Sequence, residues 1–403
     1  MFRRVGIAVG LGLCAILATP GTALAFSNNE IHIAVVTDIG GSFSDVAGTG
    51  ATVAADLAIE DVGGRIGRTP IHLSTVDHRN DPTIAAEAVR TLHAQRPISV
   101  IAELGGTDVS LPLQTLADEL GIAALHSGSL TSALTGEACS PNAVHWGYDT
   151  YSLGSVISSQ IFSNSWHLWT ILTPEGDVGD GFRDDLTRRI HASGGFVTDV
   201  VRYPFGALDL TEALIAAENG EGEAIAVATA GEDLTNMLRQ MYERGLNRSD
   251  KGVAIINMSV HDVQALGLYV TTGLEFTVPF YWDHDDQTRA FAQRFWNRAG
   301  TFPSAVHAAV YSSVRSYLQA ADAVRTDNPE RVIGRMRETP VNDFFGRGGE
   351  IRPDGRLMHP KYRVRVKTAR ESQGIGDYLD VIEEIPADAA FPPLSQSACP
   401  LLG

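Results

Sequence analysis

The chain has few cysteines for its length, and none stands in a metal-binding arrangement. Only three occur among 403 residues, and one of them, Cys14, lies in the amino-terminal apolar run. No Cys-x-x-Cys or His-x-x-x-His cluster accompanies Cys139 and Cys399. A zinc site needs several ligands at close spacing, so the sequence predicts no metal site.

Signatures of catalysis and of nucleotide binding are also missing. The sequence has no Gly-x-Ser-x-Gly, no Walker loop, no His-Glu-x-x-His and no Gly-x-Gly-x-x-Gly after its first strand. Two acid–histidine pairs, Asp77-His78 and His261-Asp262, have no nucleophile nearby in sequence, and adjacent residues of a strand point to opposite faces. We interpret both as loop-positioning or surface pairs, and we predict no enzymatic activity and no cofactor.

Basic residues are scarce relative to acidic ones. Lys and Arg total 31 against 48 Asp and Glu, which gives a formal net charge of −17 at pH 7. This charge disfavours nucleic acid and anionic membrane surfaces as partners, and it fits a soluble, monomeric exported protein. Long low-complexity segments and short-period repeats are absent. At 44% apolar residues, the chain has enough material for two hydrophobic cores.

The amino terminus has the pattern of a secretory signal peptide. Arg3 and Arg4 precede an apolar run over residues 5–18, and Ala23-Leu24-Ala25 forms a small-residue cleavage signal. We interpret residues 1–25 as a signal peptide that is cut after Ala25. The alternative is a membrane anchor, but the run is shorter than the roughly 20 residues that span a bilayer. We therefore expect no direct membrane insertion.

Removal of that peptide leaves an even pair of cysteines in an oxidising compartment. Such a pair favours one disulfide, and the alternative is two unrelated thiols. A bond between Cys139 and Cys399 would join positions 260 apart in sequence (399 − 139 = 260) and tie the carboxyl-terminal tail to the middle of the fold.

From residue 31 the sequence alternates between strands and helices, and it does so twice. This rhythm predicts a parallel, doubly wound α/β sheet in each half of the chain, with right-handed crossovers. Strands are predicted at 31–36, 71–76, 99–102, 122–125, 168–172, 196–202, 224–229 and 253–256. Helices are predicted at 51–62, 82–93, 107–120, 153–162, 179–192, 210–217 and 233–244. Two lobes with facing loops imply a cleft.

The last part of the chain is less regular. Residues 274–281 are strand-like, and helices are predicted near 287–298, 304–324 and 329–337. Residues 362–367 alternate as an edge strand would. Residues 386–403 are rich in proline without periodicity, which indicates a tail lying on the surface.

Three loops of the first half offer hydroxyl groups and backbone amides to a ligand. They are Ser42-Phe43-Ser44, Gly105-Gly106-Thr107 and Ser127-Gly128-Ser129, and each follows a predicted strand. Ligands of open α/β sheets bind outside the carboxyl ends of the strands. Free N–H groups at the start of a helix can hold a carboxylate, so we predict an anion-binding rim. Each loop taken singly is equally consistent with an ordinary helix cap.

Aromatic residues gather where the chain passes between the two halves. Trp146, Tyr148 and Tyr151 lie at the first passage, and Tyr281-Trp282 at the apparent return. Such rings stack on apolar or aromatic ligands, or pack the lobes together. We favour core packing for Trp146 and a place in the pocket for Phe43 and Tyr148.

Several motifs together resemble the type I periplasmic solute-binding proteins of branched-chain amino acid-type ABC transporters, over nearly the whole mature chain. These motifs are Gly41-Ser42-Phe43-Ser44-Asp45, residues 54–61, Asp77-His78-Arg79-Asn80, Ser140-Pro141-Asn142 with His145-Trp146, Tyr148-Asp149-Thr150-Tyr151 and Phe280-Tyr281-Trp282-Asp283. The chain is most similar to the subgroup with Cys-Ser-Pro-Asn before the first crossover and an ending like Ala398-Cys399-Pro400-Leu401. In that subgroup the two cysteines are expected to pair.

The resemblance implies two Rossmann-like lobes joined by three crossovers and closing on a ligand. It places lobe 1 at residues 26–146 and 280–350, lobe 2 at 147–279 and 351–385, and the tail at 386–403. The implied ligand contacts are Ser42, Phe43, Gly106, Thr107, Ser127, Gly128, Ser129, Tyr148, Glu175, Gly176, Thr229, Ala230 and Gly231. Two positions depart from the subgroup, which has Asn-Ser in place of Gly106-Thr107 and an aromatic residue in place of Gly176. The second departure implies a larger pocket or a different ligand.

The function implied is that of the periplasmic substrate-binding component of an ABC importer, with an inner-membrane ABC permease as its partner. We expect the ligand to be a small organic carboxylate, with aromatic acids included. The alternatives are a branched-chain amino acid or an amide, and a ligand-sensing receptor domain without transport. An amino acid would need an acidic group for its ammonium, and Glu175, Asp177 and Glu232 are the candidates.

Overall fold

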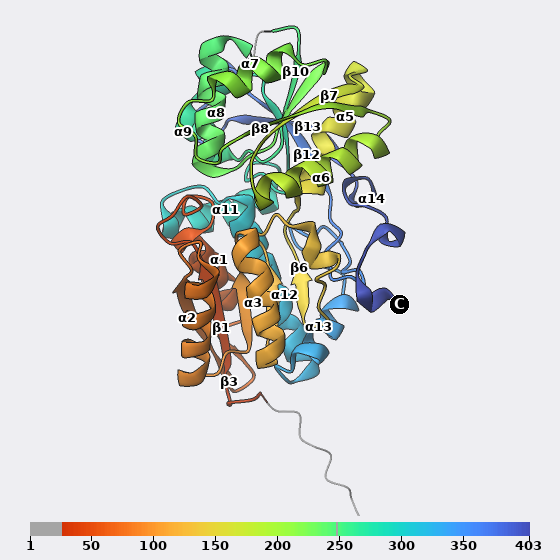
Figure 1. The fold of residues 1–403 in the computed structure, drawn as a ribbon. Coiled ribbons are helices and arrows are strands. Elements are labelled where there is room, and N and C mark those ends of the chain that lie inside the picture. Colours follow the sequence, from red (N-terminus) through yellow and green to blue (C-terminus); the bar gives the residue numbers. More distant parts are fainter. Residues whose placement is uncertain (1–25, 247–248) are drawn as a thin grey trace, which may run out of the picture.

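The computed structural model describes residues 26–246 and 249–403 of the chain. They form two α/β lobes, one stacked on the other (Figure 1). The predicted signal peptide, residues 1–25, lies outside the described residues. Within those residues, every helix is too short or too polar to cross a membrane.

The first lobe is built on a six-stranded sheet in the order β2-β3-β1-β4-β5-β6. All neighbours are parallel except β2 and β3. The strands are β1 Ile31–Thr37, β2 Arg65–Ile66, β3 Thr69–Asp77, β4 Val100–Glu103, β5 Ala123–His126 and β6 Ala143–His145. The helices that cover it are α1 Gly48–Asp61, α2 Pro82–Gln95, α3 Thr107–Leu120, α11 Asp286–Ala299, α12 Ala305–Val324 and α13 Pro329–Arg337.

Both faces of this sheet are buried. One core joins the sheet to α1, α11, α12 and α13, and a second joins it to α2 and α3. The inner strands β1, β4 and β5 are therefore buried and largely apolar, as parallel strands covered on both sides usually are, whereas β3 is more polar and partly exposed. Helices α2, α11, α12 and α13 begin at polar side-chain caps. Asp81 accepts hydrogen bonds from the backbone of Thr83 and Ile84 at the start of α2, and Ser304 accepts one from His307 at the start of α12.

The second lobe contains a seven-stranded sheet in the order β13-β12-β11-β10-β9-β7-β8. Its strands are β7 Leu168–Pro174, β8 Phe196–Tyr203, β9 Ala224–Val227, β10 Gly252–Ile255, β11 Glu275–Val278, β12 Lys361–Val366 and β13 Leu379–Ile385. Its helices are α4 Thr150–Leu153, α5 Ser155–Asn164, α6 Asp177–Ala192, α7 Thr211–Asn219, α8 Gly231–Arg244, α9 Val260–Leu266 and α10 Leu268–Thr271. The predicted fold, two parallel-dominated α/β lobes, is confirmed.

The antiparallel end of the second sheet differs from the prediction. Residues 362–367 were expected to form an edge strand, yet β12 pairs with β11 on one side and with β13 on the other. The edge strand is β13, whose sequence Leu-Asp-Val-Ile-Glu-Glu-Ile carries three acidic residues. Acidic residues are depleted in strands, so this stretch gave no strand signal. The alternation of β12 therefore reflects a half-buried interior strand.

The chain crosses between the lobes three times. It leaves the first sheet after β6, returns after β11 to form α11, α12 and α13, and crosses again before β12. Residues at the crossings contact both lobes: Tyr148 packs against the cores of both, and so does Trp282. Ile351 and Leu357, just before the third crossing, still pack in the first core. The residue numbers proposed for the lobe boundaries stay a prediction.

A buried charged network joins the first and third crossings. Arg356 Nη2 donates to Asp149 Oδ2 at 2.6 Å and lies 2.7 Å from His145 Nδ1. Both side chains of the ion pair are almost completely inaccessible, at 1% and 3% exposure. The Arg356 guanidinium also lies 5.0 Å from the ring centre of Phe391.

The tail is held more firmly than its composition indicated. A surface position was expected for residues 386–403, and most of them are exposed or partly exposed, but Ala390 and Phe391 are buried at 0% and 2% exposure. The backbone oxygen of Ala390 accepts a hydrogen bond from Arg189 Nη1 at 3.2 Å. The ring of Phe391 lies against the buried side chains of Arg356 and Lys361, an arrangement that a residue-by-residue pattern does not reveal.

The predicted disulfide between Cys139 and Cys399 is present, with the two Cα atoms 5.5 Å apart. Next to it, Ser397 Oγ donates to the backbone oxygen of Thr135 at 2.8 Å. The bond therefore holds the end of the chain against the segment that leads into the first crossing.

Removing this bond is expected to destabilise the protein. The double variant Cys139→Ser with Cys399→Ser should lose about 2–4 kcal/mol of unfolding free energy, because its unfolded chain regains the freedom that a long closed loop had lost. Urea denaturation of the variant and of the oxidised parent measures the difference. A loss below about 1 kcal/mol would mean that packing of the tail alone holds it in place.

Candidate ligand-binding site

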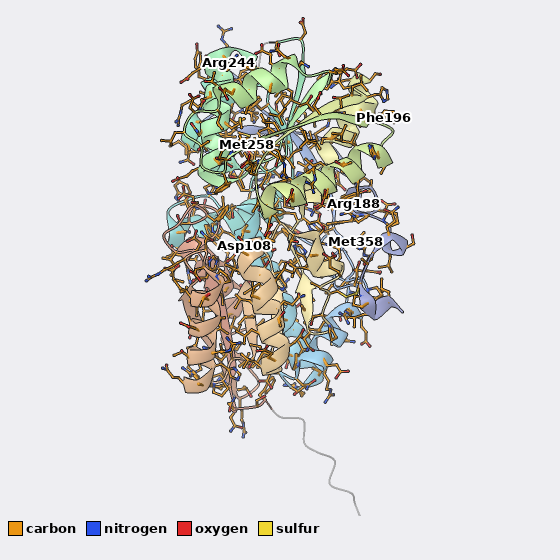
Figure 2. The ribbon with its side chains drawn as sticks, in the orientation of Figure 1. Asp108, Arg188, Phe196, Arg244, Met258 and Met358 are labelled. Atoms are coloured by element: carbon orange, nitrogen blue, oxygen red, sulfur yellow. A yellow bond between two sulfur atoms is a disulfide. The ribbon has the colours of Figure 1, made fainter. Side chains whose placement is uncertain are left out.

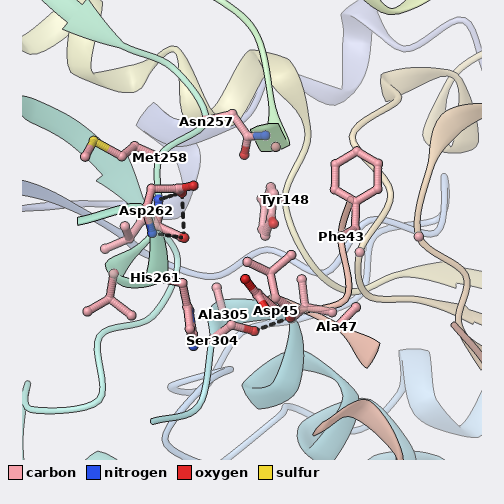
Figure 3. A pocket seen from close by; sticks show the side chains of 18 of the residues that line it. Phe43, Asp45, Ala47, Tyr148, Asn257, Met258, His261, Asp262, Ser304 and Ala305 are labelled. Carbon is pink, nitrogen blue, oxygen red and sulfur yellow. Dashed lines mark hydrogen bonds between the residues drawn. The ribbon is translucent and has the colours of Figure 1, made fainter. Parts of the chain in front are cut away.

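A cavity of about 270 Å³ lies between the two lobes. Its first-lobe walls come from the loops after β1, β3, β4 and β5 and from the start of α12. Its second-lobe walls come from the start of α8, from α9 and from the segment after β11. Figure 3 shows Phe43 on one side and Asp262 on the other, with Tyr148 between them. The cavity thus lies where ligands of open α/β sheets bind, outside the carboxyl ends of the strands.

Six of the predicted ligand-contacting residues line this cavity: Ser42, Phe43, Gly106, Gly128, Tyr148 and Gly231. They come from five separate segments and from both lobes. The prediction thus located much of the first-lobe wall, although contact with a ligand stays a prediction for each of them.

The other seven predicted residues lie outside the lining. Ser127 and Ser129 are fully buried and pair with the hydroxyls of Ser313 and Ser110. Thr229 is also buried, and its hydroxyl donates to Asp233 at 2.7 Å. Thr107 occupies the first turn of α3, Ala230 precedes α8, and Glu175 and Gly176 are exposed after β7. A ligand role for these seven stays a prediction.

The two lobes touch at the rim of the cavity. Gly231 has a positive φ of 62°, and a Cβ atom there would lie 3.6 Å from the ring of Phe43 and 3.5 Å from the backbone oxygen of Ser42. On the other side, His261 Nε2 lies 3.2 Å from the backbone oxygen of Phe302. In Figure 2, Asp108 at the first turn of α3 and Met258 mark the two sides of this boundary.

The second-lobe segment that follows β10 was not among the predicted ligand contacts. Asn257, Met258, His261 and Asp262 all line the cavity. Asp262 accepts hydrogen bonds from the backbone and hydroxyl of Ser259 at 2.8 and 2.6 Å, which starts α9 with a reciprocal cap. The position directly after a parallel strand was a usable signal. The His261-Asp262 pair was instead interpreted as a loop-positioning or surface pair.

Charge in the lining is of one sign. Among the residues that the structure describes, neither lysine nor arginine lines the cavity, and five carboxyl groups do: those of Asp38, Asp45, Glu103, Glu232 and Asp262. Asp38 is fully engaged, because it accepts hydrogen bonds from the backbone of Gly41 and Phe43 and from Asn80 Nδ2 at 2.8, 3.1 and 2.7 Å. Asp38 therefore shapes the loop before α1.

Glu103 differs from the other four carboxyl groups. It has 0% exposure, and neither oxygen accepts a hydrogen bond of good geometry. Burial raises the pKa of Glu103 to about 8, an effect that the Gly105 backbone and the Thr37 hydroxyl partly offset. No local pattern singles out this residue, since it ends an apolar strand.

Trp146 and Tyr148 lie where the sequence predicted, one in the core and the other in the lining of the cavity. Trp146 is fully buried and donates to Ser312 Oγ at 3.0 Å, so it belongs to the core. Tyr148 lines the cavity, and burial, followed by the charges of Glu103 and Asp262, raises the pKa of its hydroxyl. Trp282 also lines the cavity, stacked on Phe302 with ring centres 4.1 Å apart.

Within residues 26–246 and 249–403, the side chains of His, Cys, Asp and Glu form no group of three or more that could hold a metal ion.

Comparisons with known proteins agree with this architecture. The family model described as "Periplasmic binding protein" matches residues 30–373. The chain therefore belongs to the periplasmic binding protein family, and the resemblance seen in the sequence is confirmed. A search of curated proteins finds no match.

Solved structures are similar over most of the chain. A periplasmic binding protein from Burkholderia mallei is 30% identical, with a TM-score of 0.88, over 93% of this chain and 100% of that one. A branched chain amino acid ABC transporter periplasmic ligand-binding protein from Burkholderia xenovorans is 29% identical, with a TM-score of 0.87, over 92% and 100%. A solute-binding protein from Rhodopseudomonas palustris, solved with 3,4-dihydroxybenzoic acid, shares the fold at 18% identity and a TM-score of 0.77, over 89% and 98%.

Proposed function

We propose that this protein is the periplasmic substrate-binding component of an ABC importer, and that it captures a small organic carboxylate between its lobes. The observation that carries the proposal is the cavity of about 270 Å³ enclosed by loops from both sheets. A ligand that contacts both lobes stabilises their closed arrangement, and a permease in the inner membrane can then recognise that arrangement. The proposal includes no turnover of the ligand and a monomeric state.

The lining supports a ligand with an apolar body. Phe43, Tyr148, Met258, Ala305 and Val306 offer carbon surface from both lobes. The R. palustris relative solved with 3,4-dihydroxybenzoic acid has the same fold, so aromatic acids are the first ligands to test. The backbone of Gly106 and the Ser42 hydroxyl supply neutral hydrogen-bond donors for a carboxylate.

One observation favours a second candidate, an amino acid or an amide. Glu232 lines the cavity and could hold an ammonium group, whereas Glu175 and Asp177 lie outside the lining. The ligand would then carry a cation or a neutral N–H group to the acidic side of the cavity.

A thermal-shift screen of aromatic acids, aliphatic acids and amino acids tests the proposal. At a concentration of about 100 times its dissociation constant, a true ligand adds about 2.7 kcal/mol of stability. Calorimetry should then give a 1:1 complex for the carboxylate that stabilises most. Stabilisation by none of the carboxylates would contradict the ligand class, and conversion of a bound ligand would contradict pure binding.

A further inference from the structure

Glu103 stands at the end of the central strand β4, in an unfavourable backbone conformation. Both Glu103 and Leu104 have positive φ angles, of 78° and 61°. Non-glycine residues adopt this region at a cost, and such strain gathers at ligand-binding and active sites. The turn directs the chain from β4 toward Gly106, where α3 begins.

The carboxyl group of Glu103 lies between two glycines of the predicted anion-binding rim. A Cβ atom at Gly105 would lie 2.6 Å from Glu103 Oε1, and one at Gly128 would also be too close to that oxygen. Glu103 and both glycines line the cavity. The two loops that were expected to surround a ligand's carboxylate therefore surround a carboxyl group of the protein.

An ionised carboxylate in this place would be costly. It has neither solvent contact nor a good hydrogen-bond donor, and burying an unpaired charge costs several kcal/mol. Because burial raises the pKa of Glu103 to about 8, the neutral acid dominates at neutral pH. A neutral carboxyl group carries one O–H donor.

Other titratable groups around Glu103 leave it as the group of the lining that changes charge near pH 8. Burial lowers the pKa of both His78 and His261. It raises the pKa of Tyr148 far above pH 8, and it also raises the pKa of Asp262 above its ordinary value. The titratable groups that share the lining with Glu103 are Asp38 after β1, His78 after β3, Tyr148 at the crossing, and Asp45, Glu232, His261 and Asp262. His126 is its register partner on β5, and on α12 the buried His307 bonds to the backbone of Ala47 and Ser304 instead.

We propose that a small shift of the Glu103 side chain between Gly105 and Gly128 brings its carboxyl group to the ligand's head group, and that, as a neutral carboxylic acid, Glu103 donates a hydrogen bond to the ligand's carboxylate. This rests on the proposed function. The proton stays bonded to Glu103 while the ligand oxygen accepts the hydrogen bond, and the N–H groups at the start of α3 stabilise the ligand's negative charge. Glu103 thereby takes the place of the lysine or arginine that the lining lacks.

The affinity for the ligand's carboxylate depends on whether Glu103 is protonated. Two carboxylates cannot both be ionised at close range, so the ligand binds the protonated form only. Affinity should stay constant below about pH 8 and fall roughly tenfold per pH unit above it, as the free protein loses the proton.

Calorimetry with benzoate between about pH 6 and 9.5 tests the proposal on the wild-type protein. Isosteric benzamide and benzamidine serve as neutral and cationic probes. In Glu103→Gln the amide still donates a hydrogen bond, so benzoate affinity at neutral pH should stay within about threefold of the wild-type value. The break near pH 8, where the wild-type affinity begins to fall, should disappear. The control Asp45→Asn removes an exposed carboxylate of the same cavity and should keep the break.

The outcomes separate this inference from the proposed function. Benzoate affinity without a break near pH 8 in the wild-type protein would overturn the role of Glu103 and leave carboxylate capture standing. Benzamidine binding that is lost in Glu103→Gln would overturn both, because Glu103 would then act as an anion. If none of the three probes binds, the proposed contact between Glu103 and the ligand's head group is overturned. The proposed function is then tested separately by the wider ligand screen.

Discussion

Replacing Arg356 with methionine is expected to lower the free energy of unfolding by about 3–5 kcal/mol. The variant leaves the Asp149 carboxylate, at 3% exposure, without its partner. It also removes the cation from above Phe391 and the contact with His145. Urea denaturation at neutral pH measures the loss, with the change in midpoint read at constant slope.

A matched double variant identifies the cause. Arg356→Met combined with Asp149→Asn removes both charges and keeps an oxygen that caps α4 at Ser152, so it should recover most of the lost stability because neither partner is left as an unpaired buried charge. The exposed pair of Arg90 and Glu119 gives the comparison, since Arg90→Met should cost less than about 1 kcal/mol. A loss of that small size for Arg356→Met would show that the pair contributes little.

Filling the cavity with an indole is expected to abolish ligand binding. Ala305 stands at the first position of α12 and lines the cavity. A tryptophan there would occupy the space of a ligand ring, so affinity should fall by roughly 100-fold or more, which corresponds to about 2.7 kcal/mol. Calorimetry with the best carboxylate from the screen measures this loss.

The control for that variant lies on the same helix. Ala323→Trp makes the same substitution at an exposed position near the other end of α12, so it should leave affinity unchanged. Unimpaired binding by Ala305→Trp, with a folded protein shown by its thermal transition, would mean that the ligand binds elsewhere.

Much of the fold could be predicted because strands and helices alternate in a regular rhythm. The bounds of α3 were predicted to the residue, since Gly106-Thr107 and Gly121 mark its two ends in the sequence. Strand β13 was not predicted because it carries three acidic residues, which are uncommon in strands and which its exposed position at the edge of the sheet tolerates. The position of Phe391 depends on cations far away in sequence, Arg356 and Lys361, which no local pattern reports.

The site could be predicted in part for a related reason. Loops after parallel strands bring Ser42, Gly106 and Gly128 together, and that rule needs only the strands. Glu103 was not predicted as a site residue because it ends an apolar strand, Val-Ile-Ala-Glu. Its burial and its lack of hydrogen-bond partners result from the tertiary structure of the lobe. The acidic, lysine-free character of the lining likewise emerges from segments that are distant in sequence.

A crystal structure of the complex with the carboxylate that stabilises the protein most tests the central claim directly. We expect density for the ligand between the lobes, with its carboxylate beside Glu103 and Gly106 and its body against Phe43 and Tyr148. Density in the separate hollow between α12 and α13, lined by Arg315 and Arg335, with the space between the lobes empty, would contradict it.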